Sequence, residues 1–245
     1  MLEILYEDDA FIAVNKPCKL LVHRSEIDRH ETRFAIQMLR DQIHRKVIPV
    51  HRLDKGTSGV LLFAFESETV SAMSDVFAKG LAKKDYLAVV RGWAPEALKL
   101  DYPIAPPIDP YIKNQSTERL PAQTDFVCHA KIELPIAVDR YPQSRYSLVT
   151  AHPITGRRHQ IRKHLKHINH PIIGDSTYGK GVHNRMIAER FGVDRMLLHA
   201  YRLGFEHPFT HEWVTIDAGL DDSWLFRCFA VKSGIWKTFF LRLST

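Results

Sequence analysis

The segment "VHRLDKGTSGVLLFA", residues 50–64, joins a charged loop to an apolar run that begins at Val60. The run is short and rich in branched residues, which predicts a buried strand. Just before it, Asp54 lies between Arg52 and Lys55 and precedes a Thr-Ser-Gly turn. Catalytic groups often lie on loops that rigid strands hold, but Asp is also common in turns, where it accepts backbone hydrogen bonds. This segment alone leaves both interpretations of Asp54 open.

Other short apolar stretches predict a series of strands along the chain. Residues 2–17 predict two strands joined at Glu7-Asp8-Asp9. Because successive elements are often strands, we expect most of them to pair antiparallel in one mixed domain of the α/β class, α+β type, over residues 1–245. The further strands are predicted over residues 85–92, 126–134, 146–151, 197–205 and 213–216.

Helical spacing of apolar residues predicts helices over residues 31–43 and 67–80, and a third from about Gly156. The stretch from residue 102 to residue 121 carries five prolines and is predicted to be irregular. After Asp221 the chain is rich in aromatic residues, which we interpret as a packing helix followed by the terminus.

Composition excludes several classes of protein. The 245 residues are 45% hydrophobic, enough to bury a sizeable core. No stretch approaches the roughly 20 apolar residues of a membrane helix, and acids occupy the N-terminus where a secretory signal needs positive charge. Cys18, Cys128 and Cys228 are too far apart for a disulfide framework or a CxxC zinc site. We therefore predict a cytoplasmic protein with no membrane contact, and a monomer because no heptad pattern occurs.

Basic residues are concentrated between Thr155 and Pro171, where no acid occurs. The whole chain has 34 Lys and Arg against 28 Asp and Glu, which suits a polyanionic partner. If the stretch is helical, Arg158, Arg162 and Lys166 form one row at positions i, i+4 and i+8. A solvated charged face commonly includes acids at i+4, so this row is more typical of a surface that binds nucleic-acid phosphates.

Four histidines in the same stretch, at positions 159, 164, 167 and 170, suggest a metal site. However, no carboxylate that could orient the imidazoles occurs before Asp175, and the surrounding cations oppose a divalent ion. The chain also lacks a Walker loop, a dinucleotide fingerprint and a nucleophile elbow. We therefore predict neither a metal nor a cofactor.

Several long motifs resemble those of the RluA-type pseudouridine synthases. "LEILYEDDAFIAVNKP" resembles the opening strands of that family, and "HRLDKGTSG" resembles its catalytic loop. "KKDYLAVVRG" resembles its tyrosine strand, and "TGRRHQIRKHL" followed by "HPIIGDSTYG" resembles its C-terminal signature. The order matches, and the blocks cover most of residues 1–220. Segments such as "LLHAYRLGFEHPFTHEWVTIDAGLDDSW" are most similar to the members of the family that modify tRNA.

The resemblance implies the pseudouridine synthase catalytic fold, a bent and mostly antiparallel sheet with a central cleft and flanking helices. It implies that the protein is an isomerase that converts uridine to pseudouridine, with tRNA as its partner and the uridine at tRNA position 65 as its target. Some relatives carry an N-terminal S4-like RNA-binding module. Here the motifs begin almost at Met1, so we expect no such module and expect the cleft to bind the RNA.

The resemblance also assigns a role to the acid of the opening segment. Asp54 matches the catalytic aspartate, and a single carboxylate can act as a nucleophile on a sugar carbon. Because the isomerisation is redox-neutral and internal, it needs no cofactor. Whether Asp54 attacks the sugar carbon or the pyrimidine ring, or helps to abstract a sugar proton, stays open.

The partners of this acid follow from the matching motif positions. Extrusion of the target base costs a few kcal/mol, and Arg52 matches the arginine that fills the gap left by the flipped nucleotide. Tyr86 is expected to stack on the uracil, although a strand tyrosine is most often a packing residue. Arg162 matches the arginine that pairs with the catalytic acid. Arg158 and Lys163 are expected to contact RNA phosphates.

Three alternatives remain. The first is a synthase of the same type that acts on ribosomal RNA. The second is an RNA-binding protein without catalysis, in which loss of Asp54 would leave function intact. The third is a nucleoside or sugar hydrolase, which needs a second carboxylate to activate water; Asp175 is the candidate that the motifs offer.

Overall fold

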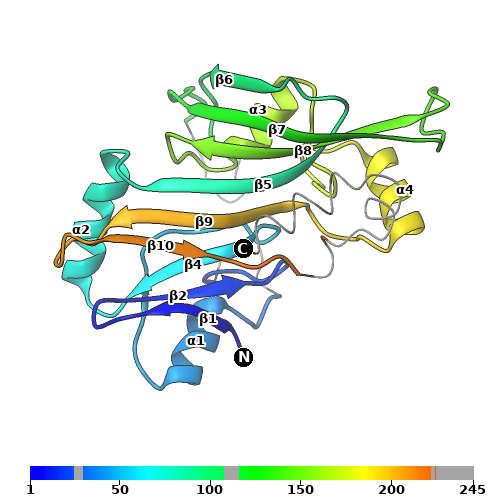
Figure 1. Cartoon of the computed structure of the whole chain (residues 1–245). Coiled ribbons are helices and arrows are strands. Elements are labelled where there is room, and N and C mark those ends of the chain that lie inside the picture. Colours follow the sequence, from blue (N-terminus) through cyan, green and yellow to red (C-terminus); the bar gives the residue numbers. More distant parts are fainter. Residues whose placement is uncertain (25–29, 108–115, 222–223, 225–245) are drawn as a thin grey trace.

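The computed structural model describes residues 1–24, 30–107, 116–221 and 224. Within them, ten strands form one sheet in the order β1-β2-β4-β9-β5-β8-β7-β6, with β10 paired to β9 and β3 paired to β4 (Figure 1). All pairs are antiparallel except β4 with β9. The strands are β1 Glu3–Glu7, β2 Phe11–Lys16, β3 Ile48–Pro49, β4 Ser58–Ala64, β5 Lys83–Arg91, β6 Ala97–Asp101, β7 Gln123–Leu134, β8 Ser144–Pro153, β9 Leu198–Glu206 and β10 Trp213–Asp217. The predicted mixed and mostly antiparallel fold is confirmed.

Four helices flank the sheet in the described part of the chain: α1 Ala35–Ile43, α2 Ser67–Ala78, α3 Gln160–His167 and α4 Gly181–Phe191. In Figure 1, α2 and α4 lie at opposite ends of the strands and α1 lies beside β1. The first three were predicted. Helix α4 was not, because its start in a Gly-Lys-Gly sequence is more typical of a turn.

Helix α3 begins four residues later than the sequence suggested. His159, just before it, adopts the left-handed conformation with φ 59°, so the helix cannot extend further back. The Gln160 side chain accepts hydrogen bonds from the Thr155 hydroxyl and the Arg157 N–H, and it donates to the Gln123 carbonyl and the Thr124 hydroxyl of β7. These bonds fasten the turn before α3 to the sheet.

The proline-rich stretch begins after β6, a strand that the sequence did not predict. In its described parts, Ile104 and Leu120 pair through two backbone hydrogen bonds, and the neighbouring residues form no helix. Residues 108–115 lie outside the described residues. The predicted helix after Asp221 lies outside them as well, except for Trp224, which is buried.

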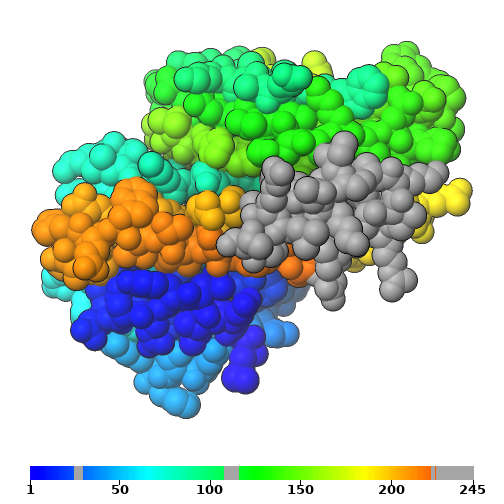
Figure 2. All heavy atoms as spheres, in the orientation of Figure 1, coloured from blue at the N-terminus to red at the C-terminus, as the bar shows by residue number. Residues whose placement is uncertain are grey.

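The core lies on both sides of the junction between β4 and β9. Strand β4 is buried along its whole length. At the junction, Gly59 has φ +109°, and a Cβ there would lie 2.1 Å from the Ala200 carbonyl oxygen. Only glycine lets the two strands approach this closely, and the loop that carries Asp54 ends directly at this contact. Figure 2 shows β1 and β2 (blue), β10 (orange) and β7 (green) in successive bands across one face.

Candidate active site

Asp54 lies where two hollows of the surface meet. The larger has a volume of about 810 Å³ and is lined by residues of the 50–57 loop, the end of α2, the start of β5 and the turn before α3. The smaller, about 460 Å³, is lined by the 52–56 and 174–177 loops among others. Arg52, Arg158, His159 and Arg162 line both hollows. The sequence motifs that are far apart along the chain therefore converge on one carboxylate.

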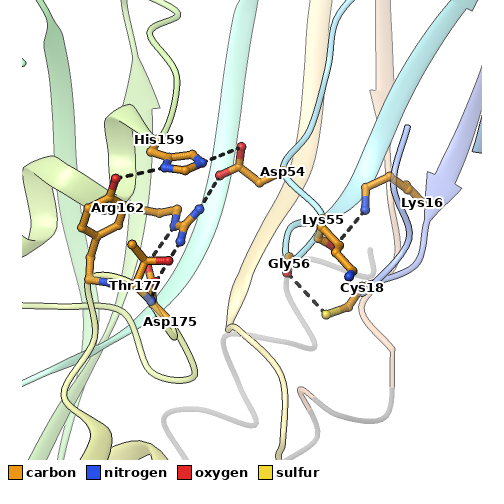
Figure 3. A network of polar contacts seen from close by, with 10 residues as sticks. Lys16, Cys18, Asp54, Lys55, Gly56, His159, Arg162, Asp175 and Thr177 are labelled. Atoms are coloured by element: carbon orange, nitrogen blue, oxygen red, sulfur yellow. Dashed lines mark hydrogen bonds and ion pairs between the residues drawn. The ribbon is translucent and has the colours of Figure 1, made fainter. Parts of the chain in front are cut away.

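The end of β2 and the residues after it fix the backbone of the loop that carries Asp54. The Thr57 N–H donates to the Asp54 carbonyl and closes the turn. Lys16 is fully buried, and its ammonium donates to the Leu20 carbonyl at 2.7 Å and to the Lys55 carbonyl at 3.4 Å. Burial lowers the pKa of Lys16 to about 7. On the same side, the Cys18 thiol contacts the Gly56 carbonyl (Figure 3). The backbone of the loop is thus fixed while the Asp54 carboxylate faces the opposite way.

Arg162 connects two carboxylates. Its Nη1 donates to Asp54 Oδ2 at 2.9 Å, and its Nε and Nη2 donate to the two oxygens of Asp175, each at 2.8 Å (Figure 3). Burial opposes ionisation of Asp175, but the hydrogen bonds and charge of Arg162 outweigh it, so the pKa of Asp175 is lowered. Burial acts against the charge of Arg162 too, but the two carboxylates raise its pKa above the ordinary value. Asp175 therefore orients Arg162, which leaves Asp175 unsuited to activate water.

The prediction of one unpaired basic row is wrong. Arg162 pairs with Asp175, which lies in the loop after α3, and the side chain of Arg162 is only 9% exposed. Arg158 is exposed but precedes the helix. Lys166 is exposed on the helix itself. The three residues do not share one solvent-facing row, because the left-handed residue His159 interrupts the helical spacing.

Lys163 and Arg158, both predicted phosphate contacts, have different surroundings. The Lys163 ammonium donates to the Ala105 carbonyl of the proline-rich stretch, and burial together with neighbouring cations lowers its pKa. Arg158 lines both hollows and is exposed. Arg52 is exposed as well and lines both hollows. Arg52 and Arg158 are therefore exposed at the cleft that the two hollows form. The Lys163 ammonium instead bonds to the backbone of the proline-rich stretch.

Tyr86 lies on β5, and its side chain lines the larger hollow. The side chain also packs against two clusters of buried hydrophobic residues. Tyr86 therefore combines the surroundings of a packing residue with those of a residue that lines the cleft. Burial raises the pKa of Tyr86, and the nearby Asp54 carboxylate raises it further. The hydroxyl therefore stays protonated and the ring presents a neutral aromatic surface to the cleft.

Two histidines of the motifs have partners that the sequence did not reveal. His159 Nε2 lies 3.6 Å from Asp54 Oδ1, and its Nδ1 lies 3.0 Å from the Tyr178 hydroxyl. His51 Nε2 accepts the Leu62 N–H at 3.1 Å, and burial lowers its pKa to about 4. His51 therefore fastens the loop to β4, whereas His159 faces the acid. Sequence position alone cannot separate the two, since each lies within a few residues of a predicted site residue.

In the described residues, no group of three or more His, Cys, Asp or Glu side chains is placed to hold a metal ion. None of the helices in that part of the chain is long and apolar enough to cross a membrane. What the cleft offers is one carboxylate oriented by a guanidinium, beside an aromatic wall and exposed arginines. Such a site suits covalent or acid–base chemistry on a planar, polyanionic ligand.

Comparisons with known proteins agree with the motifs. The family described as RNA pseudouridylate synthase matches residues 10–167. The tRNA pseudouridine synthase C of Vibrio cholerae is 48% identical over 227 residues, which cover 91% of this chain and 93% of that protein. The protein of the same name from Pasteurella multocida is 49% identical with the same coverage. Among solved structures, human RNA Pseudouridylate Synthase Domain Containing 1 has a TM-score of 0.69 and 26% identity, covering 91% of this chain and 84% of that one.

Proposed function

Because this chain belongs to the RNA pseudouridylate synthase family, we propose that it converts uridine to pseudouridine in tRNA, with Asp54 as its catalytic residue. The family resemblance of the motifs is confirmed by the match over residues 10–167. The reaction breaks the bond between N1 and C1′ and joins C5 to the same sugar carbon. A proton leaves C5 and N1 gains one, so neither an oxidant nor ATP takes part.

The contact between Asp54 and Arg162 is the observation that supports this function best. The guanidinium donates to the carboxylate at 2.9 Å and orients it toward the hollows. An ionised carboxylate can act as nucleophile or base, as the reaction requires. Asp175, the second carboxylate that a hydrolase would use, is fully buried and bonded to Arg162, which argues against hydrolysis.

The other site residues take roles that match their positions. The target base must leave its stack to reach a carboxylate in a cleft. Tyr86 then stacks on the uracil, and the exposed Arg52 occupies the gap in the RNA. Arg158, exposed at the meeting point of the two hollows, binds phosphates. Lys163 does so only if it leaves the Ala105 carbonyl.

The relatives named tRNA pseudouridine synthase C indicate the substrate. We infer that the target is the uridine at tRNA position 65, that the enzyme acts in the cytoplasm as a monomer, and that residues 1–245 form one catalytic unit. A synthase of ribosomal RNA has the same cleft chemistry, so the substrate needs a direct test.

The first experiment uses unmodified tRNA transcripts with tritium at uracil C5, incubated with the wild type and with Asp54→Asn. Pseudouridine formation releases the tritium to water without free uracil. Release by the wild type alone, with tRNA binding retained by the variant, supports the proposal, and mapping the product identifies the uridine. Release of tritium from ribosomal RNA but not from tRNA would overturn the assignment of tRNA as the substrate. No release from either RNA would overturn the proposed isomerase activity.

A further inference from the structure

The two oxygens of Asp54 have different surroundings. Oδ2 accepts a hydrogen bond of 2.9 Å from Arg162, whereas Oδ1 faces His159 Nε2 at 3.6 Å. Figure 3 shows the imidazole of His159 and the guanidinium of Arg162 approaching the carboxylate side by side. Oδ2 is therefore committed to the ion pair, and Oδ1 is the oxygen with freedom to react.

The Asp54 carboxylate and the Tyr178 hydroxyl together determine which nitrogen of His159 carries the proton. If Nδ1 carried it, the lone pair of Nε2 would face the Asp54 carboxylate, and two acceptors would oppose each other. If Tyr178 donates to Nδ1, the proton lies on Nε2 and points at Oδ1, so both contacts are favourable. The hydrogen-bond network thus selects the Nε2–H form.

His159 has this position at a conformational cost. Its φ of 59° lies in the left-handed region, which is uncommon for residues other than glycine, although Asn, Asp and His occur there more often than most. Gln160 fixes the turn on one side, and the rings of His159 and Tyr178 pack in a T-shaped arrangement with their centres 5.6 Å apart. Several contacts therefore hold the imidazole in place against Asp54.

We propose that His159 is a positioning residue that directs its Nε2–H at Oδ1 of Asp54, that Tyr178 fixes its tautomer, and that Oδ1 is the oxygen that reacts. The inference rests on the proposed function. A contact of 3.6 Å leaves Oδ1 reactive at the start of the reaction. When Asp54 acts as the nucleophile on the sugar, the Oδ1–C1′ bond forms as N1–C1′ breaks, and it breaks again as C5 bonds to C1′. The contact shortens as negative charge returns to Oδ1 in that second step, and such tightening stabilises the transition state selectively.

The charges around His159 keep it in the neutral donor form. Burial lowers its pKa to about 4, and Arg162, Arg158 and Lys163 lower it as well, while Asp54 alone raises it. Burial also raises the pKa of Tyr178. Both groups are consequently in the required form throughout the neutral pH range, so the donor at Oδ1 does not titrate there.

Two substitutions of His159 separate this role from a purely structural one. In His159→Gln, the side-chain amide can reach the position of Nε2. In His159→Asn it reaches only that of Nδ1, although Asn tolerates the left-handed backbone better. We expect Gln to retain more of kcat than Asn, which should lose about 10-fold to 100-fold, the order that a misplaced catalytic group causes. KM for tRNA should change little in either, and His167→Gln, at the far end of α3, should match the wild type.

Tyr178→Phe tests the hydroxyl while keeping the ring that Arg162 contacts at 5.0 Å. It should lower kcat about 10-fold without changing KM. In ¹⁵N spectra of histidine-labelled protein, the resonance that disappears in His159→Gln should have the Nε2–H shift in the wild type and lose that shift in Tyr178→Phe. The inference would be overturned if Tyr178→Phe kept the Nε2–H shift or the wild-type kcat. It would also be overturned if His159→Asn and His159→Gln had the same kcat. An inactive wild type would overturn the proposed function instead, because the spectra do not depend on activity.

Discussion

Arg162 and Asp175 form a buried, two-pronged ion pair with both hydrogen bonds at 2.8 Å, and this pair aims the remaining nitrogen of Arg162 at Asp54. Asp175 also accepts the backbone N–H groups of Thr177 and Tyr178 at 2.9 and 3.0 Å. The Asp175 carboxylate thus positions both the guanidinium that contacts Asp54 and the backbone of Tyr178, whose hydroxyl contacts His159. The geometry of the contact between Asp54 and Arg162 therefore depends on Asp175.

Asp175→Ala should lower both stability and activity, because it leaves Arg162 buried without its two hydrogen bonds to Asp175. Breaking a buried pair by removing one partner costs about 3–5 kcal/mol in the free energy of unfolding. Lys19→Ala removes the exposed pair with Asp194 and should cost less than about 1 kcal/mol. Urea denaturation of the two variants measures the difference, and equal losses would show that Asp175 is not a support.

The pH dependence of stability should reflect several histidines that are neutral in the folded state. Burial is the main cause that lowers the pKa of His51, His183 and His199 to about 4 each. Between that value and the ordinary 6.5, the unfolded chain binds more protons than the folded one, so stability falls as pH falls. His152 opposes this trend, because its hydrogen bond to Asp85 raises its pKa.

The measurement is the free energy of unfolding in urea at several pH values between 7 and 4. We expect a steady loss below about pH 6.5. The pKa of Asp175 is lowered by Arg162, so its contribution is complete above the ordinary carboxyl pKa of about 3.9 and is lost only as the pH falls below that value. His51→Gln keeps an acceptor for the Leu62 N–H but cannot titrate, so its slope should be smaller. A slope identical to that of the wild type would exclude His51 as a source.

The sequence predicted the parts of the fold and site that depend on local pattern or on a long motif. The strand after Asp54 has the short, branched, apolar pattern of a buried strand, and β4 is buried throughout. The partner of Arg162 was not predictable from helical spacing, because Asp175 comes from a loop that folds back onto α3. The contact of His159 with Asp54 joins residues 105 positions apart, and only tertiary structure creates it. Helix α4 was missed because its glycine-flanked start outweighs a weak apolar pattern.

The junction of β4 and β9 should be intolerant of any side chain at Gly59. Gly59→Ala combines a φ of +109° with a Cβ 2.1 Å from the Ala200 carbonyl oxygen. Backbone strain and overpacking of about 1–3 kcal/mol each predict a loss of about 3 kcal/mol or more in the free energy of unfolding. Gly219→Ala is the matched control, since a Cβ there meets nothing within 4 Å. If both variants are equally stable, the close approach at the junction is not required.

Arg158 and Arg162 are close in sequence but should have separable effects on catalysis and binding. Arg162 is buried between two carboxylates, so Arg162→Lys keeps the charge yet cannot hold both in the same geometry. We expect its single-turnover rate at saturating tRNA to fall about 100-fold, with the dissociation constant nearly unchanged. Arg158 is exposed at the cleft and should contribute mainly a phosphate contact.

Arg158→Ala should therefore weaken tRNA binding and reduce the slope of log K against log salt by about 1, while the single-turnover rate stays close to the wild type. Titrations of tRNA binding at several salt concentrations measure the slope, and tritium release at saturating enzyme measures the rate. The two arginines provide each other's control, because each variant should change one quantity and spare the other. Equal effects of both substitutions on rate and binding would contradict this division, and would mean that the exposed arginine takes part in orienting Asp54 as well.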